Sequence, residues 1–229
     1  MAKRKNGRLA SPGGFTLVEM LVSILITSLI VVAIYSIFRV QTHSVKIQEN
    51  RLEAQEYARS VLDIMVREIR NAGYFPVTVT DLVNCTPTLG GIVTAGAQTF
   101  SFNLDADANG NCAGPNERIA YTFSGGNITR AADGGAAESL TDSNATNLQL
   151  IYYPQQTGGT APPPYCYASL GDLIVNGVTC SGIVTANLAN IQRVSISVTV
   201  QSKNPDAEFG GQLNATMTSN ADLRNRGLS

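Results

Sequence analysis

The chain has 229 residues, of which 44% are hydrophobic and only 14% are charged, and its formal net charge at pH 7 is −1. Its length leaves room for one ordinary domain besides an N-terminal apolar segment, because domains cluster near ~100–150 residues. Without the four basic residues of positions 1–14, the chain has 12 Lys and Arg against 17 Asp and Glu, a formal charge of 12 − 17 = −5. This argues against general nucleic-acid binding, which requires clustered lysine and arginine.

The N-terminal apolar segment runs from Phe15 to Phe38 and contains one carboxylate, Glu19. As a helix it would be about 36 Å long, enough to span the hydrocarbon core of a bilayer. Residues 1–14 hold four basic and no acidic residues, so the N-terminus is expected to stay cytoplasmic while the rest crosses the membrane. A charge at the bilayer centre costs roughly 2.5–3.5 kcal/mol, so Glu19 predicts a partner.

Residues 13–21 read Gly-Gly-Phe-Thr-Leu-Val-Glu-Met-Leu and resemble the signature of type IV prepilins. The resemblance implies that a membrane prepilin peptidase cleaves between Gly14 and Phe15, that Phe15 is N-methylated, and that the mature chain joins a helical filament. It also implies that Glu19 contacts the N-terminal amine of a neighbouring subunit. The alternative is a plain signal anchor in which Glu19 stays hydrated near the membrane surface.

Beyond the apolar segment the helical pattern continues. No Pro or Gly interrupts residues 39–71, while Gly73 and Pro76 predict the end of the helix. We therefore expect one helix over about 15–72, unbroken through residues 28–36. An apolar stripe follows one face: Leu52, Tyr57, Val61, Leu62, Met65, Val66 and Ile69.

Past residue 76 the pattern alternates with a period of two. The clearest strand covers residues 191–203, where Val194, Ile196, Val198 and Val200 share one face. Other strands are predicted at 99–104, 118–123, 127–130, 148–153 and 213–218, with a hairpin turn over 123–127. Irregular loops are predicted at 86–96, 131–147 and 155–182.

These elements predict the α+β class, with a long N-terminal helix packed on an antiparallel β-sheet head. This is the type IV pilin fold that the resemblance implies. The expected organisation is a leader peptide at 1–14, a transmembrane helix at 15–38, its amphipathic continuation at 39–75 and an extracytoplasmic β-rich domain at 76–229.

Four cysteines follow the apolar segment: Cys85, Cys112, Cys166 and Cys180. An even number in an oxidising compartment predicts two disulfides, although the sequence allows three pairings. We favour Cys166–Cys180 together with Cys85–Cys112. A metal site is the alternative, but the spacings contain no Cys-x-x-Cys.

Three later segments resemble the PilW family of minor pilins. They are Arg-Glu-Ile-Arg-Asn-Ala-Gly-Tyr at 67–74, Glu-Arg-Ile-Ala-Tyr at 117–121 and Leu-Arg-Asn-Arg at 223–226. The resemblance implies a subunit that primes or joins type IV pilus assembly near the tip, with other minor and major pilins, prepilin peptidase and the inner membrane as partners. Before assembly the chain would be a single-pass inner-membrane protein. The same segments suit a minor pseudopilin of type II secretion, and both alternatives stay open.

One loop matches half of a calcium-binding pattern. Asp105, Asp107 and Asn109 precede Gly110 at the required spacing, but Glu117 falls one residue late for the closing ligand. A calcium site of looser geometry is therefore one interpretation, and ordinary Asx turns in a solvated loop are the other. No other cofactor is expected.

The residues do not suggest an enzyme. The only histidine, His43, lies on the helix just beyond the membrane segment, far from any catalytic serine or cysteine motif. The sequence also lacks a phosphate-binding glycine loop and a His-Glu-x-x-His motif. A membrane-anchored extracytoplasmic enzyme or binding protein remains the distant alternative.

Overall fold

The structure is a computed structural model. It describes residues 13–76, 82–86, 90–154, 162–165, 174–175, 178–179, 184–203 and 212–224. The chain divides into two compact units, of which the first ends at Ile47 and the second begins at Gln48.

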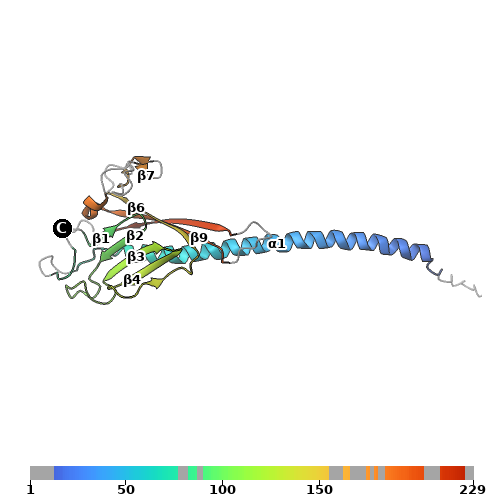
Figure 1. Ribbon diagram of the computed structural model, residues 1–229, viewed down its shortest axis with the longest axis horizontal. Coiled ribbons are helices and arrows are strands. Elements are labelled where there is room, and N and C mark those ends of the chain that lie inside the picture. Colours follow the sequence, from blue (N-terminus) through green and yellow to red (C-terminus); the bar gives the residue numbers. More distant parts are fainter. Residues whose placement is uncertain are drawn as a thin grey trace, which may run out of the picture. The chain divides into compact units, whose positions relative to one another are not determined.

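Helix α1 spans Leu17–Ile69 without interruption (Figure 1). The prediction that residues 28–36 stay helical is therefore confirmed, and the helix is only slightly shorter than expected. It ends in tight turns, because the N–H of Asn71 donates to Glu68 O at 3.0 Å and that of Ala72 to Ile69 O at 3.0 Å. Gly73 then adopts a φ of 73°, a left-handed conformation that stops the helix.

The first unit contains the apolar part of α1, which is long and apolar enough to cross a membrane by length and composition. Its large hydrophobic side chains are exposed. Several of its hydroxyl groups bond to the helix backbone: Ser23 donates to Glu19 O at 2.8 Å, and Thr27 to Ser23 O at 2.7 Å. A helix whose polar groups are internally bonded suits a lipid environment.

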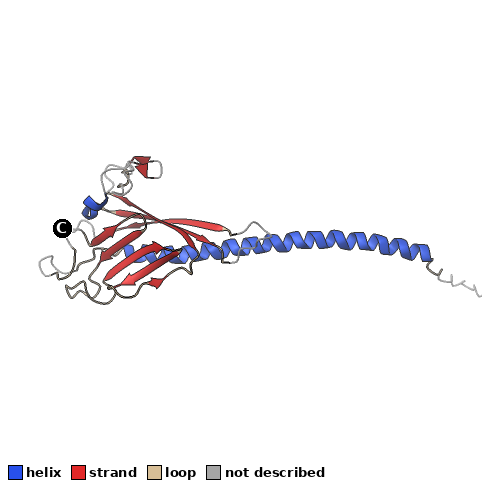
Figure 2. Cartoon of the chain, viewed as in Figure 1, coloured by secondary structure: helices blue, strands red, loops and turns tan. Residues whose placement is uncertain are grey.

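Within the described residues, the second unit holds two larger antiparallel sheets and one short ribbon (Figure 2). The five-stranded sheet has the order β1 (Ile92–Ala95), β2 (Thr99–Asn103), β3 (Arg118–Ser124), β4 (Asn127–Ala132) and β5 (Glu138–Ser139). The three-stranded sheet has the order β10 (Asn214–Asp222), β9 (Arg193–Gln201) and β6 (Ala145–Tyr153). The ribbon pairs β7 (Ile174–Val175) with β8 (Val178–Thr179), and the 3-10 turns are η3 (Val184–Ala186) and η4 (Leu188–Asn190).

All six predicted strands are present and antiparallel, which confirms the predicted fold class, and they divide between two sheets. After the two-residue strand β5 the chain turns, and β6 pairs with β9 instead of extending the first sheet. The predicted loops at 86–96, 131–147 and 155–182 are wrong in part. The first two contain β1, β5 and the start of β6, and the third contains β7 and β8. These pieces are too short to show a period of two.

The predicted hairpin joins β3 to β4. Ser124 pairs with Asn127, and the two residues between them, Gly125 and Gly126, have φ values of 57° and 80°. Two positive φ values are what a two-residue type I′ turn requires, and glycine reaches them without steric cost.

The core lies between the last part of α1 and the two sheets. The four apolar residues predicted on the buried face of β9 are fully buried, and Phe100 stacks against Phe102 and Tyr152 with ring centroids 5.6 and 5.7 Å apart. Leu52 is 58% exposed, so its predicted place in the stripe is wrong. The buried helix residues begin two positions later: Ala54, Ala58, Val61, Leu62, Met65, Val66 and Ile69.

Candidate functional site

The start of α1 is capped by its own sequence. The N–H of Glu19 donates to Thr16 Oγ1 at 3.3 Å, and the N–H of Met20 donates to Thr16 O at 3.2 Å. Thr16 is thus the N-cap, and Glu19 occupies the third helical position, as in a Thr-x-x-Glu capping box. A carboxylate in the first turn also interacts favourably with the helix dipole. The spacing of Thr16 and Glu19 in the sequence is a sufficient signal for this cap.

The expected cleavage site lies just before this cap. Gly13 and Gly14 are exposed and non-helical, and Phe15 is 73% exposed. A Cβ built on Gly14 would meet no atom within 4 Å. The fold therefore does not require glycine at this position, so a requirement for glycine here would come from a processing enzyme.

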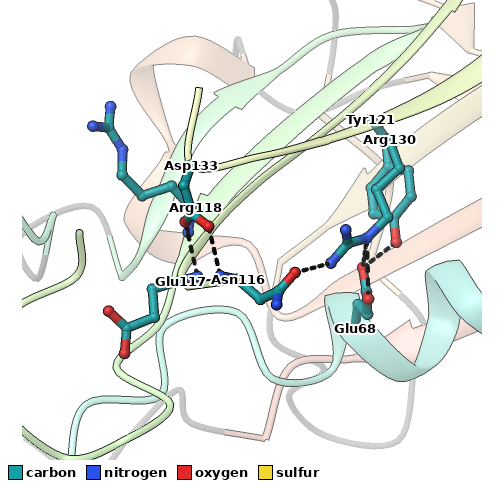
Figure 3. Close-up of polar contacts among 7 residues, drawn as sticks. All are labelled: Glu68, Asn116, Glu117, Arg118, Tyr121, Arg130 and Asp133. Atoms are coloured by element: carbon teal, nitrogen blue, oxygen red, sulfur yellow. Dashed lines mark hydrogen bonds and ion pairs between the residues drawn. The ribbon is translucent and has the colours of Figure 1, made fainter. Parts of the chain in front are cut away.

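A second polar cluster joins α1 to the five-stranded sheet (Figure 3). Arg130 Nε of β4 lies 2.9 Å from Glu68 Oε2 of α1 and 3.2 Å from Oε1. The hydroxyl of Tyr121 on β3 donates to the same Glu68 carboxylate. Arg130 Nη2 also donates to Asn116 Oδ1 at 3.0 Å. The carboxylate of Glu68 on the helix thus accepts hydrogen bonds from side chains of two adjacent strands.

The surroundings fix the protonation of this cluster. Burial raises the pKa of Tyr121 well above its ordinary value, and the adjacent Glu68 raises it further. The hydrogen bond to Glu68 raises the pKa of Arg130 although burial opposes this. Tyr121 therefore stays a hydrogen-bond donor, and Arg130 stays charged, throughout the physiological range.

Asp133 stabilises the loop that precedes β3 through hydrogen bonds to its backbone. Its carboxylate accepts backbone N–H groups from Asn116 at 2.6 Å, Arg118 at 3.0 Å and Glu117 at 3.1 Å (Figure 3). Burial opposes ionisation of Asp133, but these donors outweigh it and its pKa is lowered. The charged form of Asp133 is therefore the one that braces the loop.

Gly73, just after the end of α1, makes a close backbone contact with the sheet. The N–H of Gly73 donates to Asn103 O at 2.9 Å. A Cβ on Gly73 would clash with the carbonyl oxygen of Gly90, and one on Gly91 would clash with Gly73 itself. The segments 67–74 and 117–121, on which the second family resemblance rests, meet through the hydrogen bond from Tyr121 to Glu68.

The residues predicted as calcium ligands lie close together in the structure. Oxygens of Asp105, Asp107 and Glu117 lie within 4.8 Å of one another, and Asn109 Nδ2 donates to Asp107 Oδ2 at 2.8 Å. However, the two buried carboxylates already accept backbone N–H groups. Asp105 accepts two, at 3.1 and 2.9 Å, and Glu117 accepts that of Ala106 at 2.9 Å. This pattern is that of carboxylates bracing a loop, although their oxygens are of the kind that calcium prefers.

Cys85 and Cys112 form a disulfide, as favoured from the sequence. The bridge is next to the acidic loop, and a parallel bridge between Val83 and Asn111 supports it. Cys166 and Cys180 lie outside the described residues. Asp105, Glu117 and the disulfide thus stabilise one loop of the head.

The comparisons point to one group of proteins. Residues 47–219 match the family model described as "Prepilin peptidase-dependent protein B", and residues 11–35 match the "Prokaryotic N-terminal methylation motif". Among solved structures, the chain is similar to a type IV-like pilin, TTHA1219 from Thermus thermophilus. That match has 11% identity and a TM-score of 0.41, and covers 75% of this chain and 97% of that one. No curated protein matches the sequence.

Proposed function

Since this chain belongs to the prepilin peptidase-dependent protein B family, we propose that it is a minor pilin of the PilW type that primes or joins type IV pilus assembly near the filament tip. In this role it is a structural subunit and not an enzyme. It is inserted once in the inner membrane with the head outside the cytoplasm, and it then leaves the membrane with the filament.

The start of α1 supports this proposal most directly. The methylation motif ends in a helix whose apolar side chains are exposed in the isolated chain, so they need a covering of lipid or of other subunits. Glu19 is fixed in the first turn, four residues after the expected new N-terminus at Phe15. A neighbouring subunit's α-amine would give this carboxylate the partner that its place in the membrane requires.

The proposal is tested with Glu19→Ala and a matched control, Glu49→Ala, which removes an exposed carboxylate from the same helix. Both variants should be inserted and processed. Glu19→Ala should be missing from filaments sheared off the cells, whereas Glu49→Ala should be present at the wild-type level. Normal incorporation of Glu19→Ala would contradict the proposed contact.

The alternative role is that of a minor pseudopilin of type II secretion. A deletion strain separates the two, because loss of a minor pilin should reduce surface filaments and leave protein secretion unchanged. Loss of secretion with normal filaments would assign the chain to the secretion system. Co-purification of the mature protein with neighbouring minor pilins would identify its direct partners.

We also propose that the head needs no bound cofactor, because the carboxylates of Asp105 and Glu117 already accept hydrogen bonds from backbone N–H groups. Thermal unfolding should then be unchanged by millimolar calcium. A rise in the melting temperature that Glu117→Gln abolishes would instead establish a calcium site in this loop.

A further inference from the structure

The three-stranded sheet carries a cavity of about 340 Å³ on the face that points away from the core. This volume is within the range of small-molecule sites, roughly 300–1,000 Å³. Tyr153 of β6 and the two prolines Pro154 and Pro162 form its apolar part. Arg193 of β9 and Asp222 of β10 are among the polar residues that line the remainder.

The register of the sheet sets the geometry of this cavity. Tyr153 is paired with Arg193, and Arg193 with Asp222, so the three form one cross-strand row. In the next row Ser195 is paired with Asn220. Side chains at paired positions lie on the same face of a sheet, about 4.5–5.5 Å apart at Cβ. An aromatic ring, an ion pair and an amide therefore stand side by side on rigid strands.

The polar groups of the cavity have hydrogen-bonding capacity to spare. Arg193 Nε lies 2.6 Å from Asp222 Oδ1, which leaves the Nη groups of the guanidinium and the second carboxylate oxygen. Asn220 is exposed and Ser195 is half-buried, so both side chains are accessible to a ligand. The wall thus offers both donors and acceptors, while its one positive and one negative charge balance.

We propose that this cavity binds a pyranose unit of a neutral glycan. A pyranose ring has an apolar C–H face, which can stack on Tyr153, and a rim of hydroxyls that each donate and accept. Adjacent donors and acceptors on Arg193, Asp222 and Asn220 match such a rim. Because the charges of Arg193 and Asp222 balance, the cavity has no net attraction for a charged ligand, whose ionised group would lose hydration without gaining an unpaired counter-charge.

The test is saturation-transfer difference NMR on the full chain in micelles of a detergent that has no sugar headgroup. The probes are galactose, N-acetylglucosamine and lactose at millimolar concentrations, with N-acetylneuraminic acid as the charged comparison. At least one neutral sugar should receive saturation, most strongly at the C–H protons of one ring face. N-acetylneuraminic acid should bind more weakly.

Variants then locate the site. Asn220→Ala and Asp222→Ala should each weaken binding about tenfold, because each removes hydrogen bonds to the ligand. Thr216→Ala is the matched control, since Thr216 is exposed on the same strand outside the cavity, and it should bind like the wild type. Equal melting temperatures would show that the variants are folded. Absence of saturation for all three neutral sugars, binding that neither cavity variant changes, or preference for the charged sugar would each overturn the proposal.

Discussion

The contact between Glu68, Arg130 and Tyr121 gives the sharpest stability prediction. Glu68→Ala removes the acceptor of the fully buried Tyr121 hydroxyl, at a cost of about 1–3 kcal/mol. The substitution also removes the negative charge that pairs with Arg130. Breaking a fully buried pair costs about 3–5 kcal/mol, but the side chains of Arg130 and Glu68 are 16% and 22% exposed, so we expect about 1–2 kcal/mol for this part. The free energy of unfolding should fall by about 2–5 kcal/mol in total.

The assay is guanidinium unfolding of the full chain in detergent micelles, followed by the near-ultraviolet circular dichroism of the tyrosines. Glu68→Gln should cost less than Glu68→Ala, because the amide oxygen still accepts from Tyr121. In a double-mutant cycle, Glu68→Gln with Arg130→Met should show a coupling of at least about 1 kcal/mol.

Lys203→Met is the matched control for this experiment. Lys203 also forms an ion pair, 2.6 Å from Asp142, but the two side chains are 41% and 67% exposed. Its replacement should leave the unfolding curve unchanged, because exposed pairs contribute little. The reasoning is refuted if Glu68→Ala unfolds at the same guanidinium concentration as Lys203→Met.

Three further changes test other parts of the head. Replacing Cys85 and Cys112 together by serine opens a loop with a sequence separation of 27 and should cost about 3.5 kcal/mol in guanidinium unfolding; an unchanged midpoint would count against a native bridge. Because the pKa of folded Asp133 lies below its ordinary 3.8, its charge stabilises the fold above that pH, and this contribution is lost as the pH falls through the lower folded value. Asp133→Asn should therefore flatten the fall in melting temperature in acid, and a slope equal to the wild type's would contradict this role. Gly73→Ala should lower the melting temperature more than Gly125→Ala, whose Cβ meets no atom within 4 Å; equal shifts would show that the close contact at the helix end is not needed.

The sequence predicts what depends on local pattern. The continuous helix follows from the absence of glycine and proline between Gly14 and Gly73, and the buried face of β9 follows from four alternating apolar residues. Strand β1 was missed because its four residues lie between glycines. Leu52 was misplaced because helical spacing identifies a face but not where the sheets begin to cover it.

The polar contacts of the head were less accessible to sequence reasoning. The segments around Glu68 and Tyr121 stand out as motifs in the sequence. Their contact cannot be predicted from it, because it joins residues 53 positions apart. Arg130, which belongs to neither motif, is brought to Glu68 by the register of β3 and β4. In contrast, the cap formed by Thr16 and Glu19 is local, so its spacing in the sequence was a sufficient signal.

The central claim is that the chain is processed at the start of α1 and is then assembled through that end. The most direct measurement is the mass of the N-terminal peptide of the protein isolated from cells that contain prepilin peptidase. The account predicts a mature terminus at N-methylated Phe15, and retention of the leader when Gly14 is replaced by a larger residue. A wild-type protein that keeps its leader, or that begins at another residue, would contradict it.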